Sequence, residues 1–265
     1  MRARLQAIAE ETVAVVQAGR YQHRQAGTVE VPGVAQAVTG TRLYLPEEPL
    51  TAPGEVNAAP LIEVTRESTL AAAQRMGPAA AALVFASARK PGGGFLTGAQ
   101  AQEESVARSS ALYACLSQAH EFYAFHRNNP DLRYSDRVIY SPNVPVIRDD
   151  AGNLIAEPFC TSFLTAAAPN LGAIELNQPE FAASVPEVLQ RRCARVLRVA
   201  AAHGHRRLVL GAWGCGVFRN DPATVAHAFA AALAAVNTFD HIVFAIYEPS
   251  PQSATYAAFA ERFAS

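Results

Sequence analysis

Two consecutive acidic residues follow a run of glycines at a spacing that brings carboxylates close to a loop able to bind an anion. The acids are Glu103 and Glu104, Gln102 precedes them, and the run consists of Gly92, Gly93 and Gly94. Glycines have no Cβ, so a ligand can approach their amide groups closely, and the amides of such a loop form an anion-binding concavity. A glycine run alone is more often a flexible turn. The pair of glutamates beside it favours a ligand site.

The two glutamates are expected to divide the chemistry between them. Consecutive residues on a helix point about 100° apart, so Glu103 and Glu104 are poorly placed to flank a glycosidic bond from opposite faces, as the acids of a typical glycosidase do. One carboxylate would grip ligand hydroxyls and the other would transfer protons. A general acid needs a raised pKa at neutral pH, whereas a helix N-terminus lowers the pKa. We therefore expect the proton donor to act only when substrate phosphates are in place.

A second glycine-rich segment, residues 211–222, also runs from a predicted strand to a helix start, which is the layout that binds phosphate. Phe218 in this loop is a candidate to pack against a sugar or a base; the competing interpretation places it in the core of a strand–helix turn. Two such loops at one sheet edge indicate a diphosphate held between them. Gly214 and Gly216 resemble the dinucleotide fingerprint, but the third glycine is missing and the segment lies late in the chain, which argues against a Rossmann dehydrogenase.

Other residues capable of chemistry have simpler explanations. Cys215 is expected to be a buried structural thiol and not a nucleophile served by His203 or His205. His120 and His126 are not spaced to bind a metal, and we expect no metal. The helix predicted over residues 186–202 carries several arginines that would form a solvated face, namely Arg191, Arg192, Arg195 and Arg198.

Composition excludes several classes of protein. The chain has 265 residues, of which 50% are hydrophobic and 17% charged, with a net charge of −1. This balance argues against gripping nucleic acid by bulk electrostatics, so no direct DNA binding is expected. Residues 1–19 carry Arg2, Arg4, Glu10 and Glu11 among the apolar residues, so we expect no signal peptide, and no apolar run is long enough to span a membrane. Four cysteines without a Cys-x-x-Cys spacing fit a reducing cytoplasm. We expect a soluble, cytoplasmic protein that binds no membrane.

Strands and helices alternate from residue 61 onwards. Strands are predicted over residues 61–64, 82–86, 137–140, 144–147, 162–165, 208–211 and 241–247. Helices are predicted over residues 2–18, 68–76, 102–125, 186–202, 222–236 and 252–263. This alternation predicts a three-layer α/β domain. Ligands of such sheets bind outside the carboxyl ends of the strands, where both glycine-rich loops fall.

The glycine run, its spacer and Gln102-Glu103-Glu104 resemble the Gly-Gly-Gly-x(6–8)-Gln-Glu-Glu signature of poly(ADP-ribose) glycohydrolases. Residues 85–116, 140–150, 168–170 and 214–218 resemble the bacterial branch of that family. The resemblance implies one catalytic domain over residues 1–265, with an N-terminal extension (1–60) and a macro-domain-like α/β/α core with a mixed sheet (61–265). It implies hydrolysis of the ribose–ribose O-glycosidic bonds of poly(ADP-ribose), which releases ADP-ribose without a cofactor. It also implies a monomer that acts on ADP-ribosylated proteins, reversing ADP-ribosylation in the DNA damage response.

The same resemblance assigns roles to single residues. Glu104 would be the catalytic acid/base, Glu103 would hold ribose hydroxyls, and Gln102 would belong to the substrate-binding set. Phe218 would orient the ribose next to the scissile bond, and Tyr247 would stack on adenine. The diphosphate and the distal ribose would face the backbone of Gly92, Gly93, Gly94, Gly214, Cys215, Gly216 and Val217. Two alternatives stay open: a non-catalytic ADP-ribose-binding module, which the two glutamates disfavour, and a hydrolase of mono-ADP-ribose.

Overall fold

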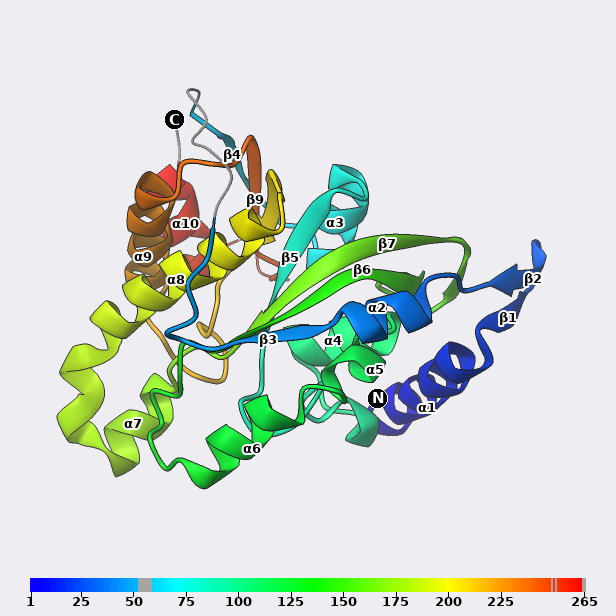
Figure 1. Cartoon of the computed structure of the whole chain (residues 1–265), viewed down its shortest axis with the longest axis horizontal. Coiled ribbons are helices and arrows are strands. Elements are labelled where there is room, and N and C mark those ends of the chain that lie inside the picture. The colour runs from blue at the N-terminus through cyan, green and yellow to red at the C-terminus, as the bar shows by residue number, and fades with distance from the viewer. Residues whose placement is uncertain (52–58, 249, 251, 264–265) are drawn as a thin grey trace.

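A mixed sheet of seven strands forms the centre of the computed structural model, which describes residues 1–51, 59–248, 250 and 252–263 (Figure 1). The strands are β3 (Arg42–Tyr44), β4 (Leu61–Thr65), β5 (Ala80–Phe85), β6 (Val138–Arg148), β7 (Leu154–Ala166), β8 (Arg207–Leu210) and β9 (His241–Ala245). Their order in the sheet is β3-β6-β7-β5-β8-β9-β4. The pairs from β7 to β4 are parallel, and β3, β6 and β7 pair antiparallel. The predicted mixed sheet is confirmed.

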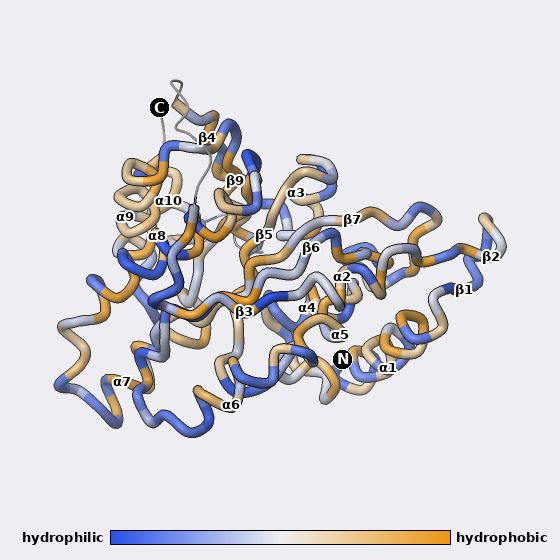
Figure 2. The backbone as a smooth tube through the Cα atoms, viewed as in Figure 1, coloured by the Kyte–Doolittle hydropathy of each residue, from blue (hydrophilic) through white to orange (hydrophobic). Residues whose placement is uncertain are grey.

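Helices cover both faces of the sheet, which confirms the three predicted layers. On one face lie α8 (Val185–Ala202), α9 (Pro222–Ala235) and α10 (Ala254–Phe263), packed on the sheet through buried residues such as Leu189, Phe229 and Phe259. On the other face lie α3 (Thr69–Met76), α4 (Gln102–Ser109) and α5 (Leu112–Leu116), packed through Leu70 and Leu112 among others. Hydrophobic residues follow the central strands between these layers (Figure 2).

The helix predicted over residues 102–125 is wrong: the chain forms α4, α5 and α6 (His120–Asn128) instead. Ser110 ends α4 in an extended conformation and forms a β-bridge with Val146. The amide of Ala111 donates to the carbonyl of Pro145 at 2.9 Å. Contacts with β6 therefore interrupt a segment whose local periodicity is helical throughout.

The N-terminal part of the chain, predicted as an extension over residues 1–60, contributes a strand to the central sheet. They form α1 (Arg2–Ala18), as predicted, then a hairpin of β1 (Arg20–His23) and β2 (Gly27–Glu30), then α2 (Val34–Gly40) and β3. β3 pairs with β6 at the edge of the central sheet, so residue 61 does not mark the start of that sheet. α1 is held by the Thr12 hydroxyl, which donates to the carbonyl of Arg108 at 2.6 Å.

The predicted solvated arginine face of α8 is wrong for two of its four members. Arg192 is fully buried and Arg195 is 9% exposed. Arg192 donates from Nε to Asp136 at 2.9 Å and from one terminal nitrogen to the carbonyls of Arg133 and Ala167, both at 2.8 Å. A buried guanidinium is tolerated when its donors are paired in this way. Within the described part of the chain, no helix is both long and apolar enough to span a membrane.

Candidate functional site

A cavity of about 950 Å³ lies at the carboxyl ends of the parallel strands. Segments that follow β5, β8 and β9 line it, together with the first turns of α3 and α4. Its size is that of a small-molecule site. Among its lining residues are most of the predicted site residues: Gln102, Glu103, Glu104, Gly214, Cys215, Gly216, Val217, Phe218 and Tyr247. The prediction that both loops meet at this edge is confirmed.

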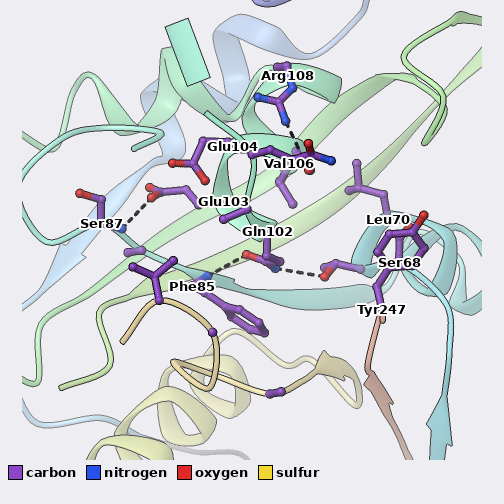
Figure 3. A pocket seen from close by; sticks show the side chains of 18 of the residues that line it. Ser68, Leu70, Phe85, Ser87, Gln102, Glu103, Glu104, Val106, Arg108 and Tyr247 are labelled. Atoms are coloured by element: carbon purple, nitrogen blue, oxygen red, sulfur yellow. Dashed lines mark hydrogen bonds between the residues drawn. The ribbon is translucent and has the colours of Figure 1, made fainter. Parts of the chain in front are cut away.

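Gln102 fixes the start of α4 to the end of β5 (Figure 3). Its Oε1 accepts a hydrogen bond from the amide of Phe85 at 2.9 Å. Its Nε2 donates to Thr69 Oγ1 at 3.0 Å and to the carbonyl of Leu83 at 2.8 Å. All polar groups of this side chain are thus engaged within the protein, so Gln102 aligns the helix that carries both glutamates.

Glu103 is the buried member of the acidic pair, with 3% of its surface exposed. Its Oε2 accepts from the amide of Ser87 at 2.6 Å, and its Oε1 has no partner among the described residues. Burial raises the pKa of Glu103 well above its usual range, the charge of Glu104 adds to this, and hydrogen bonds from the Ser87 and Gly92 amides oppose it. Burial thus opposes ionisation of Glu103, and a carboxyl group in its protonated form can donate a hydrogen bond.

Glu104 is half-buried and lines the cavity. Its Oε1 accepts from the amide of Gly94 at 2.9 Å. Gly93, at φ +60°, packs so closely that an added Cβ would overlap Glu104 Oε1 and lie 3.0 Å from its carboxyl carbon. The buried Arg108 guanidinium lies close enough to feel the charge of Glu104, which partly offsets the lowering of the arginine pKa by burial.

The glycine run stands behind the two glutamates in this structure. Gly92, Gly93 and Gly94 do not line the cavity, and the amide of Gly93 donates to the carbonyl of Lys90 at 3.0 Å. The amide of Gly94 donates to Glu104, and the amide of Gly92 lies near enough to Glu103 to lower its pKa. The run therefore holds the carboxylates, and its predicted contact with a diphosphate stays a prediction.

The second glycine-rich loop, residues 211–222, lines the cavity in part with Gly214 and Gly216, which have no side chain. Gly214 has φ +75°, and a Cβ there would overlap the Asn220 amide and lie 2.7 Å from Ala168 Cβ. Val217 is 83% exposed. Phe218 both lines the cavity and packs on the core as a partly buried residue, and its predicted contact with a sugar or a base stays a prediction. Tyr247 is 71% exposed, at the end of the cavity away from Ser87 (Figure 3).

The nucleophile alternative at Cys215 finds no support. Burial raises the pKa of Cys215 to about 12, with smaller contributions from the charges of Asp221 and Glu248. His203 and His205 precede β8, whereas Cys215 follows it. They hydrogen-bond Tyr44 and Tyr140 at 2.7 and 2.8 Å.

No metal site emerges from the described residues, none of which form a group of three His, Cys, Asp or Glu side chains that could hold an ion. His126 is buried, with its ring nitrogens 2.8 Å from the Phe122 carbonyl and from Ser135 Oγ. Sequence reasoning missed several cavity residues, among them Arg4, Ile8, Tyr134 and Gly152. They come from α1 and from loops remote in sequence, and no local pattern marks them.

Comparisons with known proteins point to one family. The family model described as microbial-type PARG, catalytic domain, matches residues 9–149. The crystal structure of poly(ADP-ribose) glycohydrolase from Thermomonospora curvata is 50% identical, with a TM-score of 0.92 over 99% of this chain and 100% of that one. The same enzyme bound to the inhibitor ADP-HPD gives 50% identity and a TM-score of 0.89, with the same coverage. The Deinococcus radiodurans enzyme in complex with ADP-ribose is 45% identical, with a TM-score of 0.82 over 88% of this chain and 98% of that one. A search of curated proteins gives no match.

Proposed function

The chain belongs to the microbial-type poly(ADP-ribose) glycohydrolases, and we propose that its cavity binds the terminal ADP-ribose of the polymer with Glu104 as the group that transfers protons. It is a glycohydrolase with the macro-domain-like α/β fold of that family. The relatives named above were solved with ADP-ribose or with the inhibitor ADP-HPD bound. Membership of a family of hydrolases favours the enzyme over a non-catalytic reader.

The observation that carries the assignment of Glu104 is the unequal exposure of the two carboxylates. Glu104 is half-buried in the cavity wall and binds the protein through one oxygen, Oε1, which leaves Oε2 for the substrate. Glu103 is buried beneath, where burial opposes its ionisation, and in its protonated form it can donate a hydrogen bond to a ribose hydroxyl. The unequal exposure supports a division of labour between the two carboxylates.

Hydrolysis then proceeds through proton transfers at one carboxyl group. As the bond between the anomeric carbon and the leaving ribose oxygen breaks, the Glu104 carboxyl protonates that oxygen. Positive charge develops on the sugar ring, and the substrate's own diphosphate stabilises it. The Glu104 carboxylate then takes a proton from the water that attacks the anomeric carbon, which restores the acid and releases ADP-ribose.

The remaining substrate contacts are assigned by position in the cavity. We propose that the backbone of Gly214, Cys215, Gly216 and Val217 faces the diphosphate and the distal ribose. Phe218 would orient the ribose next to the scissile bond. The exposed ring of Tyr247, at the far end of the cavity, is available to stack on adenine (Figure 3).

We further propose that the chain works as one catalytic domain and as a monomer. The strand β3 within the central sheet and the cavity-lining residues of α1, such as Arg4, support a single unit. Its substrates would be poly(ADP-ribose) and ADP-ribosylated proteins in the cytoplasm, in reversal of ADP-ribosylation after DNA damage. The net charge of −1 supports recognition by a local pocket without direct binding of DNA.

The test is release of free ADP-ribose from purified poly(ADP-ribose), followed by chromatography, for the wild type, Glu104→Gln and Glu103→Gln. We expect Glu104→Gln to lower the rate by at least roughly 100-fold, the scale of general acid–base catalysis. Its affinity for ADP-ribose, measured by calorimetry, should stay within about threefold of the wild type, because the distal pocket is intact. Retained activity in Glu104→Gln together with loss in Glu103→Gln would mean that the roles are exchanged.

A further inference from the structure

Tyr134 is a cavity-lining residue with a rare backbone conformation. Its φ is +60°, in the left-handed region, which a bulky L-residue seldom adopts. Such strain persists only where the surroundings hold it, and it concentrates at functional sites. Neither the sequence pattern nor the proposed reaction accounts for Tyr134.

The residues on both sides of Tyr134 are anchored to buried groups. The carbonyl of Arg133 accepts from the fully buried guanidinium of Arg192 at 2.8 Å. The hydroxyl of Ser135 lies 2.8 Å from Nε2 of His126, which is 1% exposed. The carboxylate of Asp136 accepts from Arg192 Nε at 2.9 Å. The residues that flank Tyr134 are thus anchored to α8 and α6, and these anchors hold the segment in which Tyr134 has its strained conformation.

The ring of Tyr134 packs against the ring of Phe218. The two ring centroids are 6.0 Å apart with an interplanar angle of 46°, and the His126 ring packs edge-on against Tyr134 from 5.7 Å. The backbone at Phe218 is constrained as well, because its carbonyl accepts from the amide of Gly172 at 3.0 Å and the next residue, Arg219, has φ +59°. The contact therefore joins Tyr134, which is itself strained, to Phe218, whose neighbour Arg219 is strained.

We propose that Tyr134 is a positioning residue for the ribose at the scissile bond, and that it acts through the ring of Phe218. The proposal rests on the proposed function, in which Phe218 orients that ribose. A Phe218 ring without support could leave its position, and the ribose would then lie in several orientations relative to Glu104. In the observed left-handed conformation of Tyr134 its ring lies 6.0 Å from the ring of Phe218.

The test uses Tyr134→Asn, since asparagine tolerates positive φ and the change removes the ring without adding backbone strain. Tyr134→Phe is the matched control that keeps the ring. We expect Tyr134→Asn to lower kcat on poly(ADP-ribose) by roughly 10- to 100-fold, the effect of a misplaced reacting group. Tyr134→Phe should stay within about threefold of the wild type. Thermal unfolding and circular dichroism show that the variants are folded.

A double-mutant cycle with Phe218→Ala separates positioning from direct contact. If Tyr134 acts through Phe218, then Tyr134→Asn changes kcat by less than about twofold once the Phe218 ring is absent. Independent, multiplying effects would overturn the proposal, and so would a Tyr134→Phe variant as slow as Tyr134→Asn, because the hydroxyl would then act directly. Failure of the wild type to release ADP-ribose would instead refute the proposed function, which distinguishes the two.

Discussion

Replacement of Gly93 by alanine should displace the Glu104 carboxylate and, to a smaller extent, press on Glu103, whose Oε2 would lie 3.0 Å from the added Cβ. The added Cβ would overlap Glu104 Oε1 and lie 3.0 Å from the carboxyl carbon. Carbon atoms make favourable contacts at about 3.5–4.0 Å, so the carboxyl group must recede by roughly half an ångström or more. A displacement of about 1 Å costs on the order of 100-fold in rate. We therefore expect kcat on poly(ADP-ribose) to fall by roughly 10- to 100-fold.

The variant also adds strain, which needs a control. Gly93 has φ +60°, and an L-residue in the left-handed region costs about 1–2 kcal/mol. Gly204 has φ +76° and nothing within 4 Å of an added Cβ, so Gly204→Ala carries the same backbone strain far from the cavity. Both variants should lose free energy of unfolding in urea through backbone strain, Gly93→Ala at least as much as Gly204→Ala because of the added overlap, and only Gly93→Ala should lose activity. Equal kcat values for the two would refute the reasoning that the glycine run sets the position of Glu104.

Three further predictions test the surroundings of the site. Burial lowers the pKa of His126 to about 4, so between about pH 6.5 and about pH 4 the unfolded chain binds a proton that the folded chain does not. The free energy of unfolding should therefore decline by roughly 3 kcal/mol as the pH falls through this range. Urea titrations should show this pH dependence lost in His126→Gln and kept in the control His227→Gln, which changes an exposed histidine. Trp213→Ala removes a fully buried ring packed near Phe229 and should cost about 3–5 kcal/mol in the same assay. Because the pKa of Cys215 is about 12, iodoacetamide at about pH 8 should modify this thiol only after denaturation, as mass spectrometry would detect.

The sequence predicts best those helices and strands that carry a capping residue, a proline or an apolar run within their own segment. Asp221 caps α9 by accepting from the amide of Thr224 at 2.8 Å, and Pro222 opens the helix, as the sequence indicates. The apolar run of β5 predicts a strand covered on both faces, and its residues from Ala80 to Val84 are buried. Since parallel strands end at a common edge, these local predictions were enough to bring both loops to one cavity.

Long-range contacts decide what the sequence pattern could not predict. The break at Ser110 depends on Val146, and the burial of Arg192 depends on Asp136, each far away in the chain. A helical period does not contain that information. Tyr134 is the clearest example, because neither its type nor its neighbours in sequence distinguish it from a surface loop residue. Its place in the cavity wall follows from anchors on α6 and α8.

The adjacent glutamates acquire different chemistry from one helix start. Because consecutive residues point about 100° apart, α4 can direct Glu103 into the protein and Glu104 into the cavity. At Glu103 the amides of Ser87 and Gly92 favour the charged form, whereas burial, the largest influence on its pKa, opposes it. The amides of Gly92 and Gly94 reach these carboxylates only because the spacer folds the glycine run back over the helix start. The glycines and the glutamates therefore form one structural unit, which the spacer between them closes in this chain.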